Sequence, residues 1–575
     1  MRGLLQLSGV AVRILLLCHS FNSLTQRLHV ELRERGHEVA VEFDIHDSIT
    51  EEAVVLFQPD LVIAPFLKRA IPESVWRRWR CLIVHPGIKG DRGPSALDWA
   101  ILRDEREWGV TVLEANGDFD AGDVWATRTF SMRESTKGSI YRNETTEAAV
   151  ACVLEAIEKI ASGSVRPEPL DYADASVRGR SHSPTRKTDR AINWTQQTAS
   201  EILRRIRSAD GAPGAAGQWF GEEFYFFDAH REDSLRGAPG QLIAQRHGAV
   251  CVGSVDGAVW IGHLRQVGDD GLPPLKLPAA TILGTERLTE VPEMPPGPGR
   301  TYRDLWYEEQ NGVGYLYFPF YNGAMSASQC ERLRVAVHNA AARPTRVLVL
   351  MGGPDFWSNG IHLGIIENAP SPAEESWRNI QAMDDLVLEI IRCQDHITIS
   401  AIQGNAGAGG VFLALAADHV WARNRIVLNP HYKGMGNLYG SEYWTYLLPQ
   451  RTGQDRAREM AQARLPVGTA EALRLKLIDD RFGESPAAFL HLVRDRAEAL
   501  AADLALPRLI EEKRRRRRKD EALKPLAQYR AEELERMKLN FFGFDPSYHI
   551  ARYNFIRRVP KSRTPSWLAS HRGNR

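Results

Sequence analysis

Cys81-Leu82-Ile83-Val84-His85-Pro86 is a short apolar run that ends in a histidine and a proline. Between Val12 and about Ala161, similar apolar runs alternate with helical patterns, at residues 12–18, 38–43, 60–64 and 109–114. This alternation predicts the βαβ units of an open parallel sheet. Such sheets bind ligands beyond the carboxyl ends of their strands, and His85 directly follows a predicted strand. The pattern therefore predicts a ligand site beside His85.

The start of the chain and the cysteines indicate a compartment. The apolar stretch after Arg2 looks like a secretory signal, but Arg13 interrupts it and no small-residue cleavage site follows. We therefore expect Val12–Cys18 to be the first buried strand. No apolar run approaches the roughly 18–20 residues of a membrane span. The six dispersed cysteines lack C-x-x-C spacing, which favours a reducing compartment over a disulfide scaffold or a zinc site. We expect a cytoplasmic protein with no membrane association, no metal, and cysteines that are small buried hydrophobic residues.

The 575 residues are too many for one core and suggest several domains. A polar linker, Val165–Lys187, closes the first predicted domain. The next segment opens with a helix at 200–206 and continues with short β-like runs, which suggests a small barrel. The Pro/Gly cluster Pro292–Gly299 marks another boundary, after which strands and helices alternate again until a charged helical region begins near Pro486. The predicted domains are residues 1–187, 188–295 and 300–575.

Charge patterning argues against a nucleic-acid partner. The 73 basic and 72 acidic side chains nearly balance, so no global field recruits RNA or an anionic membrane. The basic run Lys513–Lys519 is the exception, but acidic residues flank it on both sides. We interpret it as a solvated helix face rather than an RNA-binding surface. No nucleic-acid binding is expected.

A set of polar residues around the predicted strand end is suited to acyl transfer. His85 is followed by the Arg92-Gly93 turn, by Trp99 and by Asp120-Ala121-Gly122-Asp123. Formyl transfer passes through a tetrahedral oxyanion, so it needs hydrogen-bond donors and a group that handles the proton of the nucleophile. A histidine can do either, and a carboxylate such as Asp120 can orient or charge it.

At these residues the chain resembles the 10-formyltetrahydrofolate-dependent formyltransferases, which include methionyl-tRNA formyltransferase, over about residues 12–290. The resemblance implies a catalytic His85 and Asp120. The family has an asparagine two positions before this histidine, where this chain has Ile83. Loss of one oxyanion donor costs on the order of a hundredfold in rate, so we expect a thiolate acceptor, which needs less help than an amine. The folate-binding residues implied by the resemblance are Ile83, Arg92, Gly93, Asn193, Trp194, Thr195 and Gln196.

Two glycine-rich stretches further along suggest a different acyl chemistry. Phe356-Trp357-Ser358-Asn359-Gly360 and Gly404-Asn405-Ala406-Gly407-Ala408-Gly409-Gly410, followed by Asp418–Ala422, resemble the crotonase superfamily over about residues 305–485. In that superfamily two backbone N–H groups bind a thioester oxygen, and glycine lets the carbonyl approach. The resemblance places these donors at Ile361 and Gly409, with Gly360 and Gly410 beside the coenzyme A thioester.

The two glutamates with which enoyl-CoA hydratases add water are absent, because Phe412 and His431 stand at their positions. Water addition is therefore not expected, and the apolar Phe412 favours a dry pocket. The remaining acid/base candidates are His431, Tyr439 and Glu442. The residues themselves do not decide among these three.

The order of the two halves resembles the hydrogenase maturation factors of the HypX (HoxX) family. The resemblance implies an α/β chain with a Rossmann-like formyltransferase domain, a small OB-like β-barrel and a crotonase-like α/β spiral domain with a helical extension. It also implies formyl transfer from 10-formyltetrahydrofolate to coenzyme A, then decarbonylation of formyl-CoA to the CO ligand of NiFe hydrogenase. Other hydrogenase maturation proteins are candidate partners, and we expect the two pockets to share an interior cavity. Two alternatives stay open: a tRNA or amine formyltransferase with an appended crotonase domain, and a non-catalytic scaffold that binds folate and CoA.

Overall fold

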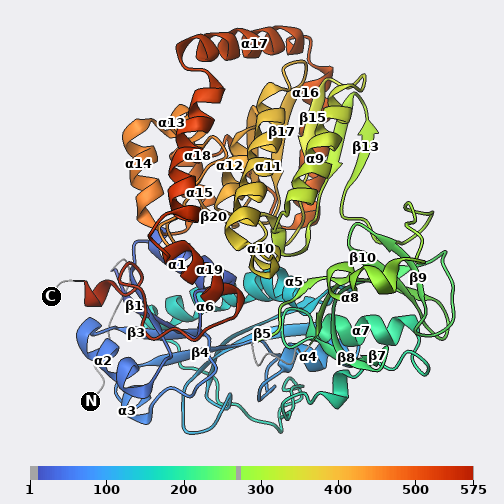
Figure 1. The fold of residues 1–575 in the computed structure, drawn as a ribbon. Helices are drawn as coiled ribbons and strands as arrows, with labels where there is room; N and C mark the ends of the chain where they lie inside the picture. The colour runs from blue at the N-terminus through green and yellow to red at the C-terminus, as the bar shows by residue number, and fades with distance from the viewer. Residues whose placement is uncertain (1–10, 267–272, 574–575) are drawn as a thin grey trace. The chain divides into compact units, whose positions relative to one another are not determined.

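The computed structural model describes residues 11–266 and 273–573 and groups the chain into two compact units. The first unit extends to Tyr302 and also contains the chain from Lys561 onward, and the second is Arg303–Pro560. Figure 1 shows the first unit mainly in blue to green and the second mainly in yellow to red. Residues 561–575 were expected to belong to the third predicted domain, whereas the structure groups them with the first unit. The finer division into three domains remains a prediction.

The first unit contains a six-stranded sheet of order β2-β1-β3-β4-β5-β6. Its first four strands are parallel, as expected, but β5 runs antiparallel to β4, and β6 runs antiparallel to β5. The strands are β1 Arg13–Cys18, β2 Glu38–Phe43, β3 Leu61–Phe66, β4 Cys81–His85, β5 Glu107–Glu114 and β6 Val124–Ser131.

Helices pack on this sheet through apolar side chains. Phe57 and Val54 of α2 share an apolar cluster with Leu15 and Leu17 of β1, and α1 and α6 pack against each other and against the sheet. The first unit's helices up to this point are α1 Ser23–Glu34, α2 Asp47–Phe57, α3 Glu73–Trp76, α4 Ala96–Leu102, α5 Lys137–Ile140 and α6 Thr146–Ser162.

The predicted small barrel corresponds to an antiparallel sheet of order β7-β8-β11-β10-β9, with β12 paired to β11. Its helix α7 begins with a capping box between Thr198 and Glu201, and α7 buries Ile202 and Ile206 against the sheet. The elements are α7 Ala199–Ala209, β7 Ala215–Trp219, β8 Glu222–Glu232, β9 Leu242–Arg246, β10 Ala249–Gly253, β11 Ala258–Gln266, β12 Leu277–Pro278 and α8 Ala279–Leu288.

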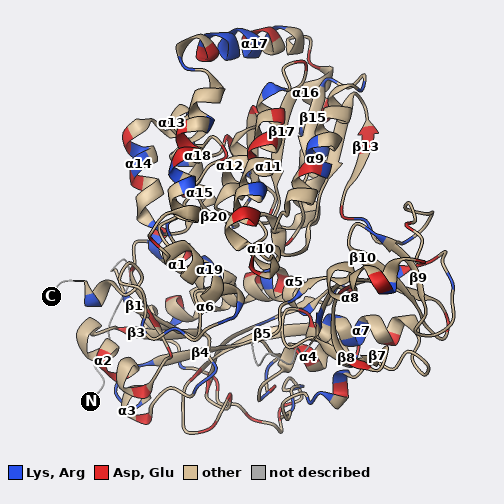
Figure 2. Cartoon of the chain, viewed as in Figure 1, with Lys and Arg blue, Asp and Glu red and all other residues tan. Residues whose placement is uncertain are grey.

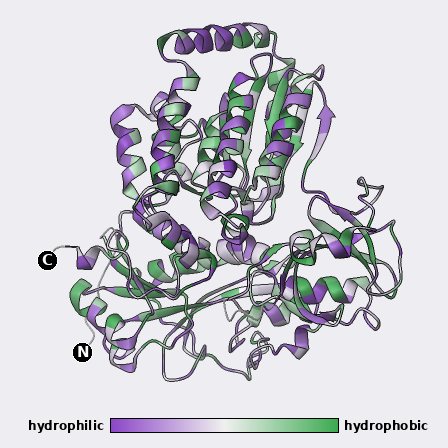
Figure 3. Ribbon diagram, in the orientation of Figure 1, coloured by the Kyte–Doolittle hydropathy of each residue, from purple (hydrophilic) through white to green (hydrophobic). Residues whose placement is uncertain are grey.

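The second unit has two sheets built from short, fully buried apolar runs such as Val347-Leu348-Val349-Leu350. The larger sheet has the order β13-β14-β15-β17-β19-β22 and the smaller one β16-β18-β20-β21. Hydrophobic residues concentrate on β15 and β17 (Figure 3). The strands are β13 Trp306–Gln310, β14 Val313–Tyr317, β15 Val347–Leu350, β16 Phe356–Ser358, β17 Ile397–Ile402, β18 Asn405–Gly407, β19 His419–Arg423, β20 Val427–Asn429, β21 Val467–Gly468 and β22 Asp480–Phe482.

Helices α9 and α11 pack against each other in the main core of this unit. The helices are α9 Ala327–Ala341, α10 Leu363–Asn368, α11 Pro372–Arg392, α12 Gly409–Leu415, α13 Trp444–Thr452, α14 Gln454–Ala463, α15 Thr469–Arg474, α16 Pro486–Ala502, α17 Leu506–Leu523, α18 Leu526–Phe542 and α19 Ser547–Ile556. Among the described residues, no helix combines the length and the hydrophobicity needed to cross a membrane. All six cysteines are buried and unbridged, which confirms the sequence interpretation.

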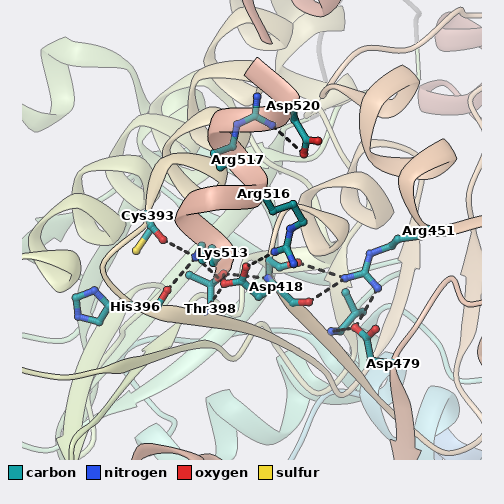
Figure 4. A network of polar contacts seen from close by, with 12 residues as sticks. Cys393, His396, Thr398, Asp418, Arg451, Asp479, Lys513, Arg516, Arg517 and Asp520 are labelled. Atoms are coloured by element: carbon teal, nitrogen blue, oxygen red, sulfur yellow. Dashed lines mark hydrogen bonds and ion pairs between the residues drawn. The ribbon is translucent and has the colours of Figure 1, made fainter. Parts of the chain in front are cut away.

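The basic run lies on α17, where Figure 2 shows it in blue. The expectation of a wholly solvated face is wrong at two positions, because Lys513 and Arg517 are buried. Lys513 Nζ lies 2.5 Å from a carboxylate oxygen of Asp418 and donates to the carbonyl oxygens of Cys393 and His396 at 2.5 and 2.9 Å (Figure 4). Asp418 precedes β19 and its carboxylate also accepts from Thr398 N, so it needs a cation. The basic run therefore attaches α17 to the rest of the second unit.

The end of the chain packs on the edge strand β2. Glu42 is fully buried there, and His571 Nε2 and Arg572 Nε lie 2.9 and 2.7 Å from its Oε2. Thr564 Oγ1 donates to Glu42 and accepts from Phe43 N at 2.8 Å. Burial alone raises the pKa of Glu42, but hydrogen bonds from His571, Thr564 and Arg572 outweigh it and lower that pKa. No local sequence pattern predicts this pairing, since the partners are more than five hundred residues apart.

We expect Thr564→Val to destabilise the first unit by about 1–3 kcal/mol, because it removes one hydrogen bond to the buried Glu42 carboxylate and the nearer acceptor of the Phe43 N–H. Hydrogen–deuterium exchange over residues 38–43 should rise, while exchange in the second unit should not. The matched control is Thr289→Val, whose hydroxyl lies on an exposed part of the same unit. Equal exchange in both variants would show that the tail does not secure β2.

Candidate functional site

The first candidate site is centred on His85, the last residue of β4, which is buried between two carboxylates. Its Nδ1 lies 3.5 Å from Asp120 Oδ2, so the predicted His85–Asp120 pair is brought together. Its Nε2 lies 2.8 Å from Asp91 Oδ2. Asp120 is in the left-handed region and accepts a hydrogen bond from Gly93 N at 3.1 Å. The ring is therefore oriented through both of its nitrogen atoms.

Sequence reasoning missed Asp91 and His182. The Asp91 side chain is fully buried, and its Oδ1 lies 3.1 Å from His182 Nε2. His182 comes from the predicted linker, which runs beside the His85 loop through hydrogen bonds from Arg92 N to Arg180 O and from His182 N to Arg92 O. Gly87 makes the loop possible, because a Cβ there would lie 2.5 Å from His85 Nε2. Asp91 was detectable as a carboxylate in the same loop, but nothing in the sequence pointed to His182.

The other predicted residues near His85 have mainly structural contacts. Ile83 lies in β4, where its backbone pairs with β3 and β5. Its side chain offers no hydrogen-bond donor in place of the asparagine that the formyltransferases have at this position. Arg92 Nε donates to Phe119 O at 3.0 Å and holds the loop that carries Asp120. Trp99 Nε1 donates to Ser183 O at 2.8 Å. Their role toward folate stays a prediction.

The stretch Asn193–Gln196 forms a polar turn before α7. Asn193 Oδ1 accepts from Thr195 N, and Asn193 Nδ2 donates to Gln196 Oε1. The Trp194 side chain is instead buried in the apolar core beside Trp219 and Phe226. Asn193, Thr195 and Gln196 are therefore exposed and keep accessible polar groups, whereas the buried Trp194 side chain anchors the turn to the apolar core.

The second candidate site forms where the two glycine-rich segments meet. Strands β16 and β18 pair in parallel and bring Gly360 beside Gly409: a Cβ at Gly360 would lie 3.3 Å from Gly409 N. Gly409 begins α12, so its N–H belongs to the first turn and has no intrahelical acceptor. Ala408, just before it, has φ 48°, a costly conformation that sets the direction of this N–H. Ile361 follows Gly360 on the facing segment, as the oxyanion-hole prediction requires.

Glu442 lies directly against this junction. A Cβ at Gly409 would come within 2.1 Å of Glu442 Oε1, so only glycine leaves room for the carboxyl group. The Tyr432 hydroxyl and Ser441 N both donate to Glu442 Oε2. Burial raises the pKa of Glu442 to about 8, with a further contribution from Asp384, although the bonds from Tyr432 and Ser441 lower it. A buried carboxyl that titrates near neutral pH is suited to acid/base work.

Tyr432 was not among the predicted residues, yet its hydroxyl and not that of Tyr439 bonds Glu442. Tyr432 stacks on Phe412 with ring centroids 5.2 Å apart, which places the apolar residue beside the carboxyl as expected for a dry pocket. Tyr439 lies on the wall of a cavity of about 40 Å³ lined by Phe412, Pro430, Tyr432, Lys433, Leu438, Tyr439, Trp444, Ala461 and Gln462. Its ring packs on Trp444, and burial raises its pKa.

His431 is half-buried, and neither of its buried ring nitrogens has a hydrogen-bond partner among the described residues. Burial, followed by the charge of Arg464, lowers its pKa to about 4, so the ring is neutral at neutral pH. A neutral imidazole can still accept a proton, and His431 stays a predicted candidate. Gly410 is packed against Ser358, since a Cβ there would lie 2.0 Å from Ser358 O, so it joins the two glycine-rich segments.

Comparisons with known proteins agree with this architecture. The chain matches the formyl transferase family over residues 13–157, the formyl transferase C-terminal domain over 184–275 and the enoyl-CoA hydratase/isomerase family over 308–535. It is 28% identical to methionyl-tRNA formyltransferase of Desulfotalea psychrophila over 169 residues, which cover 28% of this chain and 50% of that protein.

Two relatives span both halves. Hydrogenase maturation factor HoxX of Bradyrhizobium diazoefficiens is 56% identical over 561 residues, 98% of this chain and 97% of that protein. The crystal structure of HypX from Aquifex aeolicus in complex with tetrahydrofolic acid has a TM-score of 0.94 and 49% identity, and covers 98% of this chain and 99% of that one. The chain belongs to the HypX/HoxX family of hydrogenase maturation factors, in which formyltransferase domains are joined to a crotonase-like domain.

Proposed function

We propose that the protein transfers a formyl group from 10-formyltetrahydrofolate to coenzyme A and then decarbonylates formyl-CoA to CO and free CoA. The observation that carries the proposal is the Glu442 carboxyl group, which lies against Gly409 at the oxyanion-hole junction with the Tyr432 hydroxyl on its far oxygen. Tetrahydrofolic acid bound to the HypX of Aquifex aeolicus supports folate as the first carrier. The CO would serve hydrogenase maturation in the cytoplasm, where other maturation proteins are proposed partners.

In the first step the CoA sulfur adds to the formyl carbon, and the bond from that carbon to N10 of the folate breaks. The thiol loses one proton and N10 gains one, so the step is balanced without another reactant. His85 is the proposed carrier of this proton, and Asp91 and Asp120 hold its ring. Because Ile83 supplies no oxyanion donor, the step relies on the nucleophilicity of the thiolate.

In the second step the formyl C–H bond and the C–S bond of formyl-CoA both break. Glu442 takes the formyl proton, the C–H electron pair stays on carbon as CO forms, and the thiolate sulfur receives the proton. The N–H groups of Ile361 and Gly409 are the proposed donors to the thioester oxygen. Phe412, stacked on Tyr432, keeps water away and so suppresses hydrolysis to formate.

The direct test is incubation of the purified protein with formyl-labelled 10-formyltetrahydrofolate and CoA, followed by assay of label in CO, formyl-CoA and formate. We expect label in CO, with tetrahydrofolate released in equal amount and CoA regenerated. Label that remains in the folate, or that appears in formate alone, would contradict the proposal. Label in a formylated tRNA or amine would instead favour the formyltransferase alternative.

CO release from formyl-CoA should depend on pH because only ionised Glu442 can accept the formyl proton. With its pKa raised to about 8, the base is mostly protonated at lower pH, so the rate should rise through neutral pH and level off above about pH 8. The contribution of Glu442 to stability has the opposite pH dependence. Because its pKa is higher in the folded than in the unfolded protein, this contribution is fully present below the unfolded-state pKa and is lost as pH rises toward the folded-state pKa. A rate that falls over the same range would exclude Glu442 as the base.

Internal transfer of formyl-CoA between the His85 pocket and the oxyanion hole remains our proposal, because this thioester is labile. An added thioesterase would hydrolyse any formyl-CoA that escapes from the protein. Loss of CO output in the presence of the thioesterase would overturn internal transfer. RNA binding is not part of the proposal, since Lys513 and Arg517 of the basic run are engaged within the chain.

A further inference from the structure

Glu442 reaches the oxyanion-hole junction from an unusual turn. Glu442 and Tyr443 are consecutive residues with φ 60° and 57°, and neither is a glycine. Each such residue costs on the order of 1 kcal/mol or more and persists only where the surroundings enforce it. The turn directly precedes α13, so its conformation fixes both the carboxyl position and the start of that helix.

A buried carboxylate of α18 holds the second half of the turn. Glu533 is fully buried, and its Oε2 accepts from Tyr443 N at 2.9 Å while its Oε1 accepts from Thr445 N at 2.8 Å. These amides belong to the beginning of α13, so Glu533 acts as a helix cap supplied by a distant element.

A second buried carboxylate, on α11, holds the first half. Asp384 Oδ1 accepts from Glu442 N at 2.8 Å, and both Asp384 oxygens accept from Ser441 Oγ at 2.8 and 2.9 Å. Arg530 Nε is 3.6 Å from Asp384 Oδ2 and only partly offsets its charge. The turn is therefore clamped between two carboxylates that belong to different helices.

We propose that Asp384 and Glu533 are positioning residues for CO release, which clamp the Ser441–Thr445 segment so that the Glu442 carboxyl faces the oxyanion hole. The assignment of a reaction to Glu442 rests on the proposed function. The clamp itself rests on the hydrogen bonds to Ser441, Glu442, Tyr443 and Thr445. Neutral side chains would fill the same space without the cost of burying charge, so stability alone does not account for two carboxylates here.

The clamp also sets the electrostatics of Glu442. The titratable and charged groups around it are Asp384 on α11, Glu533 and Arg530 on α18, Tyr432, and the Cys330 thiol on α9. Burial raises the pKa of Asp384, although Arg530 lowers it. The negative charge of ionised Asp384 opposes ionisation of Glu442. Removing that charge should make Glu442 more acidic.

The test compares Asp384→Asn and Glu533→Gln with two matched controls on the same helices. Glu389→Gln changes a carboxyl of α11 that pairs with His338, and Glu532→Gln changes an exposed carboxyl of α18 that pairs with Lys524. Infrared titration of the full chain reports the protonated carboxyl band of Glu442, assigned by its loss in Glu442→Gln. This readout does not require the protein to release CO.

In Asp384→Asn we expect the Glu442 midpoint to move to lower pH by about one unit. The pH limb of CO release from formyl-CoA should move with it, whereas both controls should match the wild type. Glu533→Gln keeps one acceptor oxygen but places an NH₂ group against one of the two backbone donors, so we expect kcat for CO release to fall about tenfold or more with little change in KM.

The two hypotheses fail in different ways. If the Glu442 midpoint moves as expected but neither the wild type nor Asp384→Asn releases CO, the clamp stands and the proposed function fails. If the midpoint stays in place in Asp384→Asn, or if kcat in Glu533→Gln equals that of Glu532→Gln, the positioning role is wrong. Should Glu533→Gln fold poorly, Glu533→Asp provides the second test, since the shorter side chain keeps a carboxyl group but cannot reach both amides.

Discussion

Glu442→Gln should reduce CO release from formyl-CoA by about a hundredfold or more, the usual loss when a general base is removed. Glutamine fills the same buried space and can still accept from Ser441 N and Tyr432. It cannot take up the formyl proton. Formyl-CoA formation should continue at the wild-type rate, because His85 and its partners lie in the other unit. The intermediate should therefore accumulate.

The measurement is a single-turnover assay in which CO and formyl-CoA are quantified together. Glu471→Gln is the matched control, because the side chain of this glutamate is partly exposed in the same unit and, within the described part of the chain, forms an ion pair with nearby Arg474. Tyr432→Phe and Tyr439→Phe should differ: the first removes the hydrogen bond to Glu442 and should slow CO release, and the second should have a smaller effect. If CO output persists in Glu442→Gln, the base lies elsewhere, and His431 is the next candidate.

The sequence predicted the fold well where periodicity carried the information. The strands at 38–43 and 81–84 were predicted from apolar runs that are mostly buried in the structure, and such runs depend only on local residues. The antiparallel direction of β5 was missed because an apolar run predicts a strand but not the direction of that strand in the sheet. The contacts of Thr564, His571 and Arg572 with β2 were missed for a related reason, since hydrogen bonds to Glu42 produce no periodic pattern in the sequence.

The residues of the candidate sites also fall into those that sequence motifs predicted and those that only the fold reveals. Gly360, Gly409 and Glu442 were predicted from motifs, and the structure brings all three together. Tyr432 and His182 were missed because an isolated tyrosine or histidine belongs to no sequence motif, and only the fold reveals its partner. The choice between Tyr432 and Tyr439 shows the limit clearly: both are tyrosines near Glu442 in the sequence, and the direction of one hydroxyl separates them.

His85→Ala should abolish formyl transfer, with at least a hundredfold loss in the rate at which tetrahydrofolate is released in the presence of CoA. CO release from supplied formyl-CoA should be unchanged, which makes this variant the converse of Glu442→Gln. CoA binding, measured by calorimetry, should also remain. Wild-type release of tetrahydrofolate in His85→Ala would remove the assignment of this site.

Asp91→Asn tests whether catalysis needs the His85 imidazole to be correctly oriented, in addition to being present. Asparagine keeps the shape of the side chain but offers either an oxygen or an NH₂ group to His85 Nε2, 2.8 Å away, and it weakens the contact with His182. We expect a loss of about tenfold to a hundredfold, between that of a surface substitution and that of His85→Ala. Asp118→Asn is the control, because this aspartate lies on the exposed loop before Asp120. If Asp91→Asn and Asp118→Asn behave alike, Asp120 alone orients the ring and the site follows the ordinary formyltransferase arrangement. A loss confined to Asp91→Asn would instead mean that, in a chain without the asparagine at position 83, the second carboxylate takes part in the handling of the thiol proton.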